Sequence, residues 1–232
     1  MVSLRVLYEN PEVWNMSHKL QTVFLLILCL TVCVPSINSS EGGNGSLLSG
    51  SDQSPVKIEV FSDFECPACR ELFLQTIRPV MQEYKDKVGI IYYEFPLNMH
   101  PYSRPASRYV LAAARLGNQK ALSVMSSIYT DQAQWDYANN REAPASRSLD
   151  RLEMAVSKAL SHEDFLEVKK MLQDPGTLSD INDNIEKELK LGELREIRST
   201  PTMFIFYSGK QQKIEGMVTL PVMKQFLSKL VK

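Results

Sequence analysis

Four short segments of the chain have the composition of buried or half-buried strands. The segments 56–61, 88–95 and 202–207 are rich in β-branched and aromatic residues, and a further strand is predicted at 211–215 after a Ser-Gly turn. Since the first two segments are separated by a helical pattern and the last two only by a turn, the order predicts a βαβ half and a ββα half.

Helical patterns fill the rest of the chain. Residues 70–87 read as one helix, in which Pro79 is expected to cause a kink. From about 100 to 192, several helical segments follow each other, separated by prolines and glycines, and 220–231 closes the chain as an amphipathic helix. The predicted fold class is therefore α/β, with a helical insertion at about 100–192 between the two halves.

The N-terminal region has the pattern of an export signal. The apolar run 20–34 follows His18 and Lys19 and is followed by small polar residues, which is the pattern of a secretory signal peptide. The run is shorter than the roughly 20 apolar residues of a membrane span, although an uncleaved anchor stays open. Because the first fifteen residues fit no targeting pattern, Met16 is the expected true start.

Three regions follow from these patterns. Residues 1–36 are interpreted as an N-terminal extension with signal peptide or anchor, 37–54 as a flexible Gly/Ser-rich linker, and 55–232 as one domain of ordinary size. The predicted location is therefore periplasmic or extracellular. A formal net charge of −1 without long basic runs argues against nucleic acid or an anionic membrane surface as the main partner.

Cys66-Pro67-Ala68-Cys69 lies where the first strand passes into the first helix. The unpaired N–H groups and the dipole of a helix N-terminus stabilise a thiolate at Cys66. Pro67 suits the first helical position, where a missing N–H costs nothing. One helical turn brings Cys69 close to Cys66, so the motif is typical of a thiol–disulfide exchange site.

Other readings of a CxxC motif are half of a zinc site and an inert structural disulfide. A zinc site needs four ligands, but the remaining cysteines, Cys29 and Cys33, lie in the apolar N-terminal run, and the three histidines form no pair at ligand spacing. No metal is therefore expected. A two-residue spacer closes so short a loop that a structural disulfide gains little chain entropy.

Three motifs in order resemble those of the DsbA-like thiol–disulfide oxidoreductases of the thioredoxin superfamily. They are FSDFECPACREL at 61–72, EFPLNMHPYSRPASRYVLAAA at 94–114 and STPTMFIFYSGKQQKIEG at 199–216. The resemblance extends over about 56–232. It implies a thioredoxin-like fold with a helical insertion, and it implies no metal or organic cofactor.

The resemblance also implies roles for the motif residues. Cys66 would be the nucleophile and Cys69 the more buried resolving thiol, forming the redox-active Cys66–Cys69 disulfide. Pro67 and Ala68, between the two sulfurs, would influence the reduction potential.

The Thr200-Pro201 dipeptide resembles the cis-proline loop of this family. A cis bond there would place the backbone of Thr200 beside the cysteine pair, where it can hydrogen-bond an extended substrate strand. The residues alone favour an ordinary trans-proline at the start of a strand.

The chain departs from the family pattern at Val60, six positions before Cys66, where many relatives carry a buried acid. Glu59 is expected on the opposite face of the strand because neighbouring side chains alternate. Glu65 adjoins the nucleophile, where its charge would oppose thiolate formation. His100 is interpreted as a structural residue after the second strand.

The sequence therefore predicts an extracytoplasmic thiol–disulfide oxidoreductase that exchanges disulfides with client proteins, with oxidation of the client as the favoured direction. Its membrane redox partner would be a quinone-linked oxidase or an electron donor. The alternatives are a membrane-fed reductase or isomerase, and a non-catalytic thioredoxin-fold adaptor or chaperone.

Overall fold

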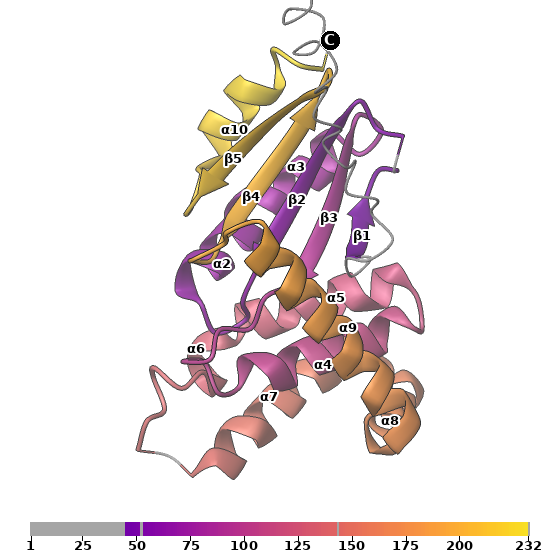
Figure 1. Cartoon of the computed structure of the whole chain (residues 1–232). Coiled ribbons are helices and arrows are strands. Elements are labelled where there is room, and N and C mark those ends of the chain that lie inside the picture. The colour runs from indigo at the N-terminus through magenta and orange to yellow at the C-terminus, as the bar shows by residue number, and fades with distance from the viewer. Residues whose placement is uncertain (1–44, 52, 143, 232) are drawn as a thin grey trace, which may run out of the picture. The chain divides into compact units, whose positions relative to one another are not determined.

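The structure is a computed structural model that describes residues 45–231 except positions 52 and 143. The predicted signal or anchor at 1–36, with Met16, Cys29 and Cys33, lies outside the described residues. Within the described part, five strands form one mixed sheet with helices on both of its faces (Figure 1).

The sheet has the strand order β1-β3-β2-β4-β5. The parallel pair β2 and β3 lies at its centre, and the other neighbouring strands run antiparallel. The bounds are β1 Ser46–Ser49, β2 Val56–Ser62, β3 Val88–Glu94, β4 Thr202–Tyr207 and β5 Lys210–Glu215. The four predicted strands are confirmed to within a residue at either end.

The edge strand β1 was not expected from the sequence, which predicts a flexible linker over 37–54. Residues 46–49 instead pair antiparallel with β3, with Leu47 opposite Ile91. Leu48 is buried, so one leucine anchors the strand to the core. The linker interpretation is therefore wrong for these four residues, which are too few to show a strand pattern.

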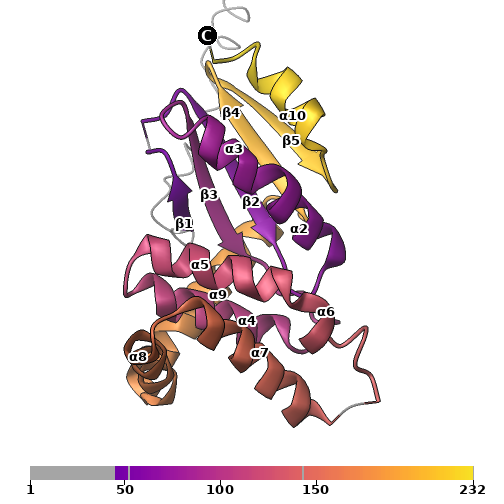
Figure 2. The ribbon, with the colours of Figure 1, turned by 180° about the vertical axis from the view of Figure 1, so that it is seen from behind.

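One face of the sheet is covered by the helical run that follows the cysteine motif. It comprises α2 (Pro67–Leu72), the π-helical turn η1 (Phe73–Ile77) and α3 (Arg78–Glu83). The C-terminal helix α10 (Leu220–Leu227) packs beside η1 and α3 (Figure 2). The wide turn ends just before Pro79, which has no N–H to continue the ordinary helical hydrogen bonds. The expected irregularity at Pro79 thus takes the form of a π turn.

The predicted helical insertion lies between β3 and β4. Its helices are α4 (Ser103–Ala114), α5 (Asn118–Thr130), α6 (Gln132–Trp135), α7 (Ala145–Ala159), α8 (His162–Gln173) and α9 (Pro175–Leu194). They gather where β2 and β3 end, as both views show (Figures 1 and 2). No helix in the described residues is both long and apolar enough to cross a membrane.

The two faces of the sheet bury separate apolar clusters. Val60 and Tyr92 belong to the main core, which also contains both described cysteines. Phe61, the next residue along β2, belongs to a second cluster with Phe204 and with Leu191 of α9. Strand alternation therefore decides which β2 side chains can reach the cysteine motif.

Candidate active site

Cys66 is the N-cap residue of α2. Its backbone is extended, with φ −74° and ψ 119°, and Pro67 occupies the first turn. The Asp63 carboxylate accepts a hydrogen bond from the Cys66 N–H at 3.1 Å, which fixes the loop before the helix. Pro67 is exposed and Ala68 half-buried. The predicted position of Cys66 at a helix N-terminus is confirmed.

The two thiols differ in exposure and in acidity. Both are free cysteines in this structure, with Cys66 8% exposed and Cys69 completely buried. A hydrogen bond from the Cys69 thiol, helped by the Cys69 N–H, lowers the pKa of Cys66 to about 6 despite its burial. Burial raises the pKa of Cys69 well above its ordinary value. The pair therefore holds its negative charge on Cys66 and its proton on Cys69.

The loop before β4 lies against the nucleophile. The Thr200–Pro201 bond is cis, as the resemblance implied. The Cys66 thiol donates to the Thr200 carbonyl oxygen at 3.3 Å. The buried Thr200 hydroxyl has no hydrogen-bond partner among the described residues, and its place beside Cys66 contributes to the lowered pKa of that thiol. The structure thus brings Thr200 and Pro201 to the cysteine pair.

Asp63 is a site residue that the sequence reasoning missed. It is completely buried, and one carboxylate oxygen accepts from the N–H groups of Glu65 and Cys66. The other accepts from the Leu97 N–H at 2.7 Å and lies 3.0 Å from Nδ1 of His100. The hydrogen bond to Asp63 raises the pKa of His100. The signal was present in the turn, since an Asp after a strand commonly accepts from the next N–H groups.

Glu65 does not have the effect expected of it. Its carboxylate turns toward the start of α4 and accepts from three backbone N–H groups, those of Tyr102, Ser103 and Tyr137, at 2.6 to 2.9 Å. The carboxylate that raises the pKa of Cys66 is instead that of Asp63. The expectation that Glu65 opposes the thiolate is therefore wrong, because unpaired helix N–H groups attract its charge elsewhere.

The strand positions beneath the cysteines agree with the alternation argument. Val60 is buried on the cysteine side, whereas Glu59 pairs with Arg195 on the other. Arg195 also lies over the rings of Phe61 and Phe204 of the second cluster. Glu59 therefore cannot replace the acid that is missing at Val60.

A group of buried hydroxyls lies beneath Cys69 instead. The Cys69 thiol accepts from the N–H of Asp63 at 3.5 Å. The Ser62 hydroxyl partly offsets the rise that burial causes in the pKa of Cys69. It lies 3.0 Å from the Tyr129 hydroxyl, which lies 2.6 Å from that of Tyr92. This group could not be predicted from the sequence, because Tyr129 comes from α5, far along the chain.

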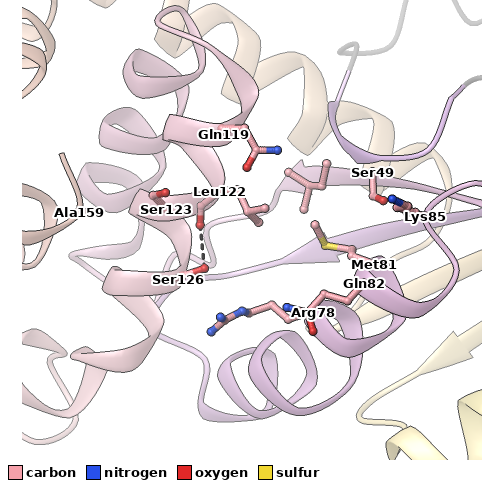
Figure 3. A pocket seen from close by; sticks show the side chains of 11 residues that line it. Ser49, Arg78, Met81, Gln82, Lys85, Gln119, Leu122, Ser123, Ser126 and Ala159 are labelled. Carbon is pink, nitrogen blue, oxygen red and sulfur yellow. Dashed lines mark hydrogen bonds between the residues drawn. The ribbon is translucent and has the colours of Figure 1, made fainter. Parts of the chain in front are cut away.

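A groove of about 710 Å³ lies between β1, α3 and α5 and contains neither cysteine. Its two cationic side chains lie apart, with Lys85 beside Ser49 and the Arg78 guanidinium on the other side of the view, so they do not converge on a common ligand (Figure 3). Within the described residues, no cluster of three or more His, Cys, Asp or Glu side chains could hold a metal ion.

The chain is similar to known proteins in sequence and fold. A family model described as thioredoxin matches residues 43–228. Over 193 residues the chain is 22% identical to the probable disulfide bond formation protein D of Bacillus cereus, covering 79% of this chain and 84% of that protein.

Solved structures agree on the fold. The crystal structure of α-DsbA1 from Wolbachia pipientis is similar, with a TM-score of 0.60, 19% identity and coverage of 81% of this chain and 90% of that one. The thiol-disulfide exchange protein α-DsbA2 from the same organism has a TM-score of 0.59 at 17% identity, covering 78% and 84%.

Proposed function

Because the chain belongs to the thioredoxin family and is a DsbA-like member of that superfamily, we propose that it is an extracytoplasmic thiol–disulfide oxidoreductase acting on client proteins. The observation that carries the proposal is the unequal pair of thiols. Cys66, at a helix N-terminus, has a pKa of about 6, and Cys69 beside it is buried and keeps its proton. An incidental CxxC motif does not need this asymmetry.

The proposed exchange has two steps. A client thiolate attacks Cys66 of the Cys66–Cys69 disulfide, so that a client–Cys66 bond forms and Cys69 leaves as a thiolate that takes up a proton. A second client thiolate then attacks the client sulfur of the mixed disulfide, and Cys66 leaves as a thiolate. The client gains a disulfide, and the protein receives two electrons.

Oxidation of the client is the proposed direction. A stabilised Cys66 thiolate favours the reduced protein and so makes its disulfide oxidising. Proteins of this chemistry have nucleophile pKa values between about 3.5 in strong oxidants and about 7 in reductants. The value of about 6 for Cys66 therefore supports an oxidant of moderate strength. In this proposal a membrane redox partner, such as a quinone-linked oxidase, reoxidises the pair.

The surrounding residues have proposed roles in the same cycle. Thr200 and Pro201 lie against Cys66, where the backbone of Thr200 can hydrogen-bond an extended client segment. Pro67 and Ala68 separate the two sulfurs and are proposed to tune their potential. The export of the domain at 55–232 by residues 1–36, to the periplasm or the cell exterior, belongs to the proposal as well.

The test is a glutathione redox titration of the full chain carrying Cys29→Ser and Cys33→Ser, with the Cys66–Cys69 disulfide followed by mass spectrometry. A potential near about −120 mV or moderately below supports an oxidant, whereas about −270 mV indicates a reductase. If no reversible disulfide forms, the enzyme proposal is refuted.

A trapping experiment separates the enzyme from a non-catalytic adaptor. Cys69→Ser leaves Cys66 able to form a mixed disulfide but removes the resolving thiol, so client proteins should accumulate in covalent complexes. Cys66→Ser should abolish both exchange and trapping. An adaptor would keep its activity in both variants.

A further inference from the structure

The proton of the resolving thiol cannot pass directly to bulk solvent. Cys69 is completely buried, and the acid that many relatives carry at the position of Val60 is absent. A thiol must lose its proton before it can attack a disulfide. Since Glu59 lies on the other face of β2, the route must start from a different side chain on the cysteine face.

Ser62 occupies that face, two residues after Val60. In the parallel pairing of β2 and β3, Val60 lies beside Tyr92 and Ser62 beside Glu94. β3 therefore places a tyrosine beside the apolar Val60 and a carboxyl group beside the Ser62 hydroxyl. Ser62, Tyr92 and Glu94 are all about 1% exposed, so no bulk solvent separates them.

Three hydroxyl groups lie between Cys69 and this carboxyl group. The Cys69 thiol accepts from the N–H of Asp63, the residue after Ser62, at 3.5 Å, and the Ser62 hydroxyl partly offsets the rise that burial causes in the pKa of Cys69. The Ser62 hydroxyl lies 3.0 Å from the hydroxyl of Tyr129, which lies 2.6 Å from that of Tyr92. In both hydroxyl pairs either oxygen can be the donor, so the three hydroxyl groups can pass a proton in either direction.

Glu94 lies at the far end of this series of hydroxyl groups, and one of its carboxylate oxygens is unpaired. Its Oε2 accepts from the Ser107 hydroxyl at 2.6 Å, while Oε1 is buried and has no hydrogen-bond partner among the described residues. An unpaired buried carboxylate oxygen is costly and calls for an explanation. In the sheet Glu94 lies beside Ser62, two residues after Tyr92. Burial, and to a smaller extent the charge of Glu94, raises the pKa of both Tyr92 and Tyr129.

We propose that Ser62, Tyr129 and Tyr92 form a buried proton relay between the Cys69 thiol and the carboxyl group of Glu94. The relay rests on the proposed function, because it serves the exchange reaction of the cysteine pair. The relay gives Cys69 a proton acceptor through side chains of β2, β3 and α5, because Val60 of β2 cannot serve as one.

When Cys69 resolves a mixed disulfide on Cys66, its proton passes to Ser62, each hydroxyl hands its own proton onward, and Glu94 becomes protonated. The Cys69 thiolate attacks the Cys66 sulfur, the Cys66–Cys69 bond forms, and the partner sulfur leaves with the electron pair. In the reverse direction Glu94 returns the proton to the Cys69 thiolate.

The transfer has to be concerted. Burial raises the pKa of both Tyr92 and Tyr129 well above the ordinary value, so a tyrosinate intermediate is unfavourable. Burial also raises the pKa of Glu94, so its carboxyl group holds a proton that reaches it. No described hydrogen bond joins either tyrosine to Glu94, so the last transfer requires Glu94 to turn its free oxygen toward them.

Other titratable groups also surround Cys69 and would contribute to any pH profile. They are Cys66 on α2, Asp63 before it, Tyr92 and Glu94 on β3, Tyr129 on α5, and Glu188 of α9 beside Glu94. The test must therefore separate the Cys69 step from the chemistry of Cys66.

Ellman's reagent separates the two steps in the reduced full chain carrying Cys29→Ser and Cys33→Ser. Cys66 attacks first and releases one thionitrobenzoate, and Cys69 then resolves the mixed disulfide and releases the second. Three variants interrupt the relay: Ser62→Ala, Tyr92→Phe combined with Tyr129→Phe, and Glu94→Gln. Tyr109→Phe is the matched control, since the hydroxyl of this half-buried tyrosine bonds Glu153 and takes no part in the relay.

At neutral pH each relay variant should slow the second release at least about tenfold, as expected for lost proton transfer, and leave the first within about twofold. Heavy water should slow the second release of the unsubstituted protein, and less so in the variants. An unchanged second release in any relay variant, or an equal loss in Tyr109→Phe, overturns the relay. If the unsubstituted protein gives no second release, the proposed function itself fails.

Discussion

Replacing Cys69 by alanine should raise the pKa of Cys66 substantially. The pKa of Cys66 is about 6, against an ordinary value of 9.0, and the largest cause of this difference is the hydrogen bond from the Cys69 thiol. The backbone N–H of residue 69 also donates to the Cys66 sulfur, and that donor survives the substitution. The variant therefore removes one identifiable contribution and leaves the helix N-terminus intact.

The expected size follows from the strength of such bonds. A hydrogen bond to a charged group contributes about 1.5–3 kcal/mol, and about 1.4 kcal/mol corresponds to one pH unit. Cys69→Ala should therefore bring the pKa of Cys66 to about 7–8. Cys69→Ser is the matched control, because its hydroxyl can still donate to the thiolate, and its pKa should stay near that of the unsubstituted protein.

The assay is the pH dependence of Cys66 alkylation by iodoacetamide, checked against the ultraviolet absorbance of the thiolate. The rate should follow the thiolate fraction and shift to higher pH in Cys69→Ala alone. If the alanine variant titrates at the same pH as the serine variant, the Cys69 side chain does not set the acidity of Cys66. The helix N-terminus and backbone would then account for the whole effect.

Three further substitutions test the packing around the site by urea unfolding. Glu65→Ala leaves three backbone N–H groups without an acceptor and should lower the free energy of unfolding by about 2–4 kcal/mol. A decrease under about 0.5 kcal/mol would contradict this role of Glu65. Burial raises the pKa of Glu188 to about 7 from 4.5, so the folded state binds the extra proton and stability should fall as pH rises from about 4.5 to about 7. Glu188→Gln should flatten that fall, and an unchanged pH profile would refute it. Gly192→Ala would put a Cβ 2.2 Å from the ring of Phe95. The variant should be less stable, because overpacking costs about 1–3 kcal/mol and the gain in helix propensity is about 1 kcal/mol. A more stable variant would show that the ring moves aside.

The sequence predicted most of the fold because the central strands are strongly patterned. β2, β3 and β4 are fully or largely buried and carry β-branched and aromatic side chains, so their positions could be read directly. β1 could not be, since it has four residues and only Leu48 is buried. The π turn was also beyond local patterns, because it depends on how the helix accommodates Pro79.

The candidate site was predictable only where its residues adjoin in sequence. Cys66 and Cys69 are identified by their motif and its place between a strand and a helix. Asp63 and His100 meet only in the fold, as do Ser62 and Tyr129, which are 67 residues apart. The expected effect of Glu65 was wrong because its direction depends on N–H groups of α4 and a later loop.

The two edge strands determine whether a further strand, from a second copy of this protein or from an unfolded polypeptide, can pair with the sheet. One edge is β1, a four-residue strand with an irregular register against β3, and the other is β5, whose sequence KQQKIE is largely exposed and carries two lysines. Short, irregular or lysine-bearing edges are poor templates for further strands. A protein proposed to hold unfolded clients by a covalent bond would benefit from this. It could keep a client near Cys66 without the client's extended segments joining the sheet and seeding aggregation.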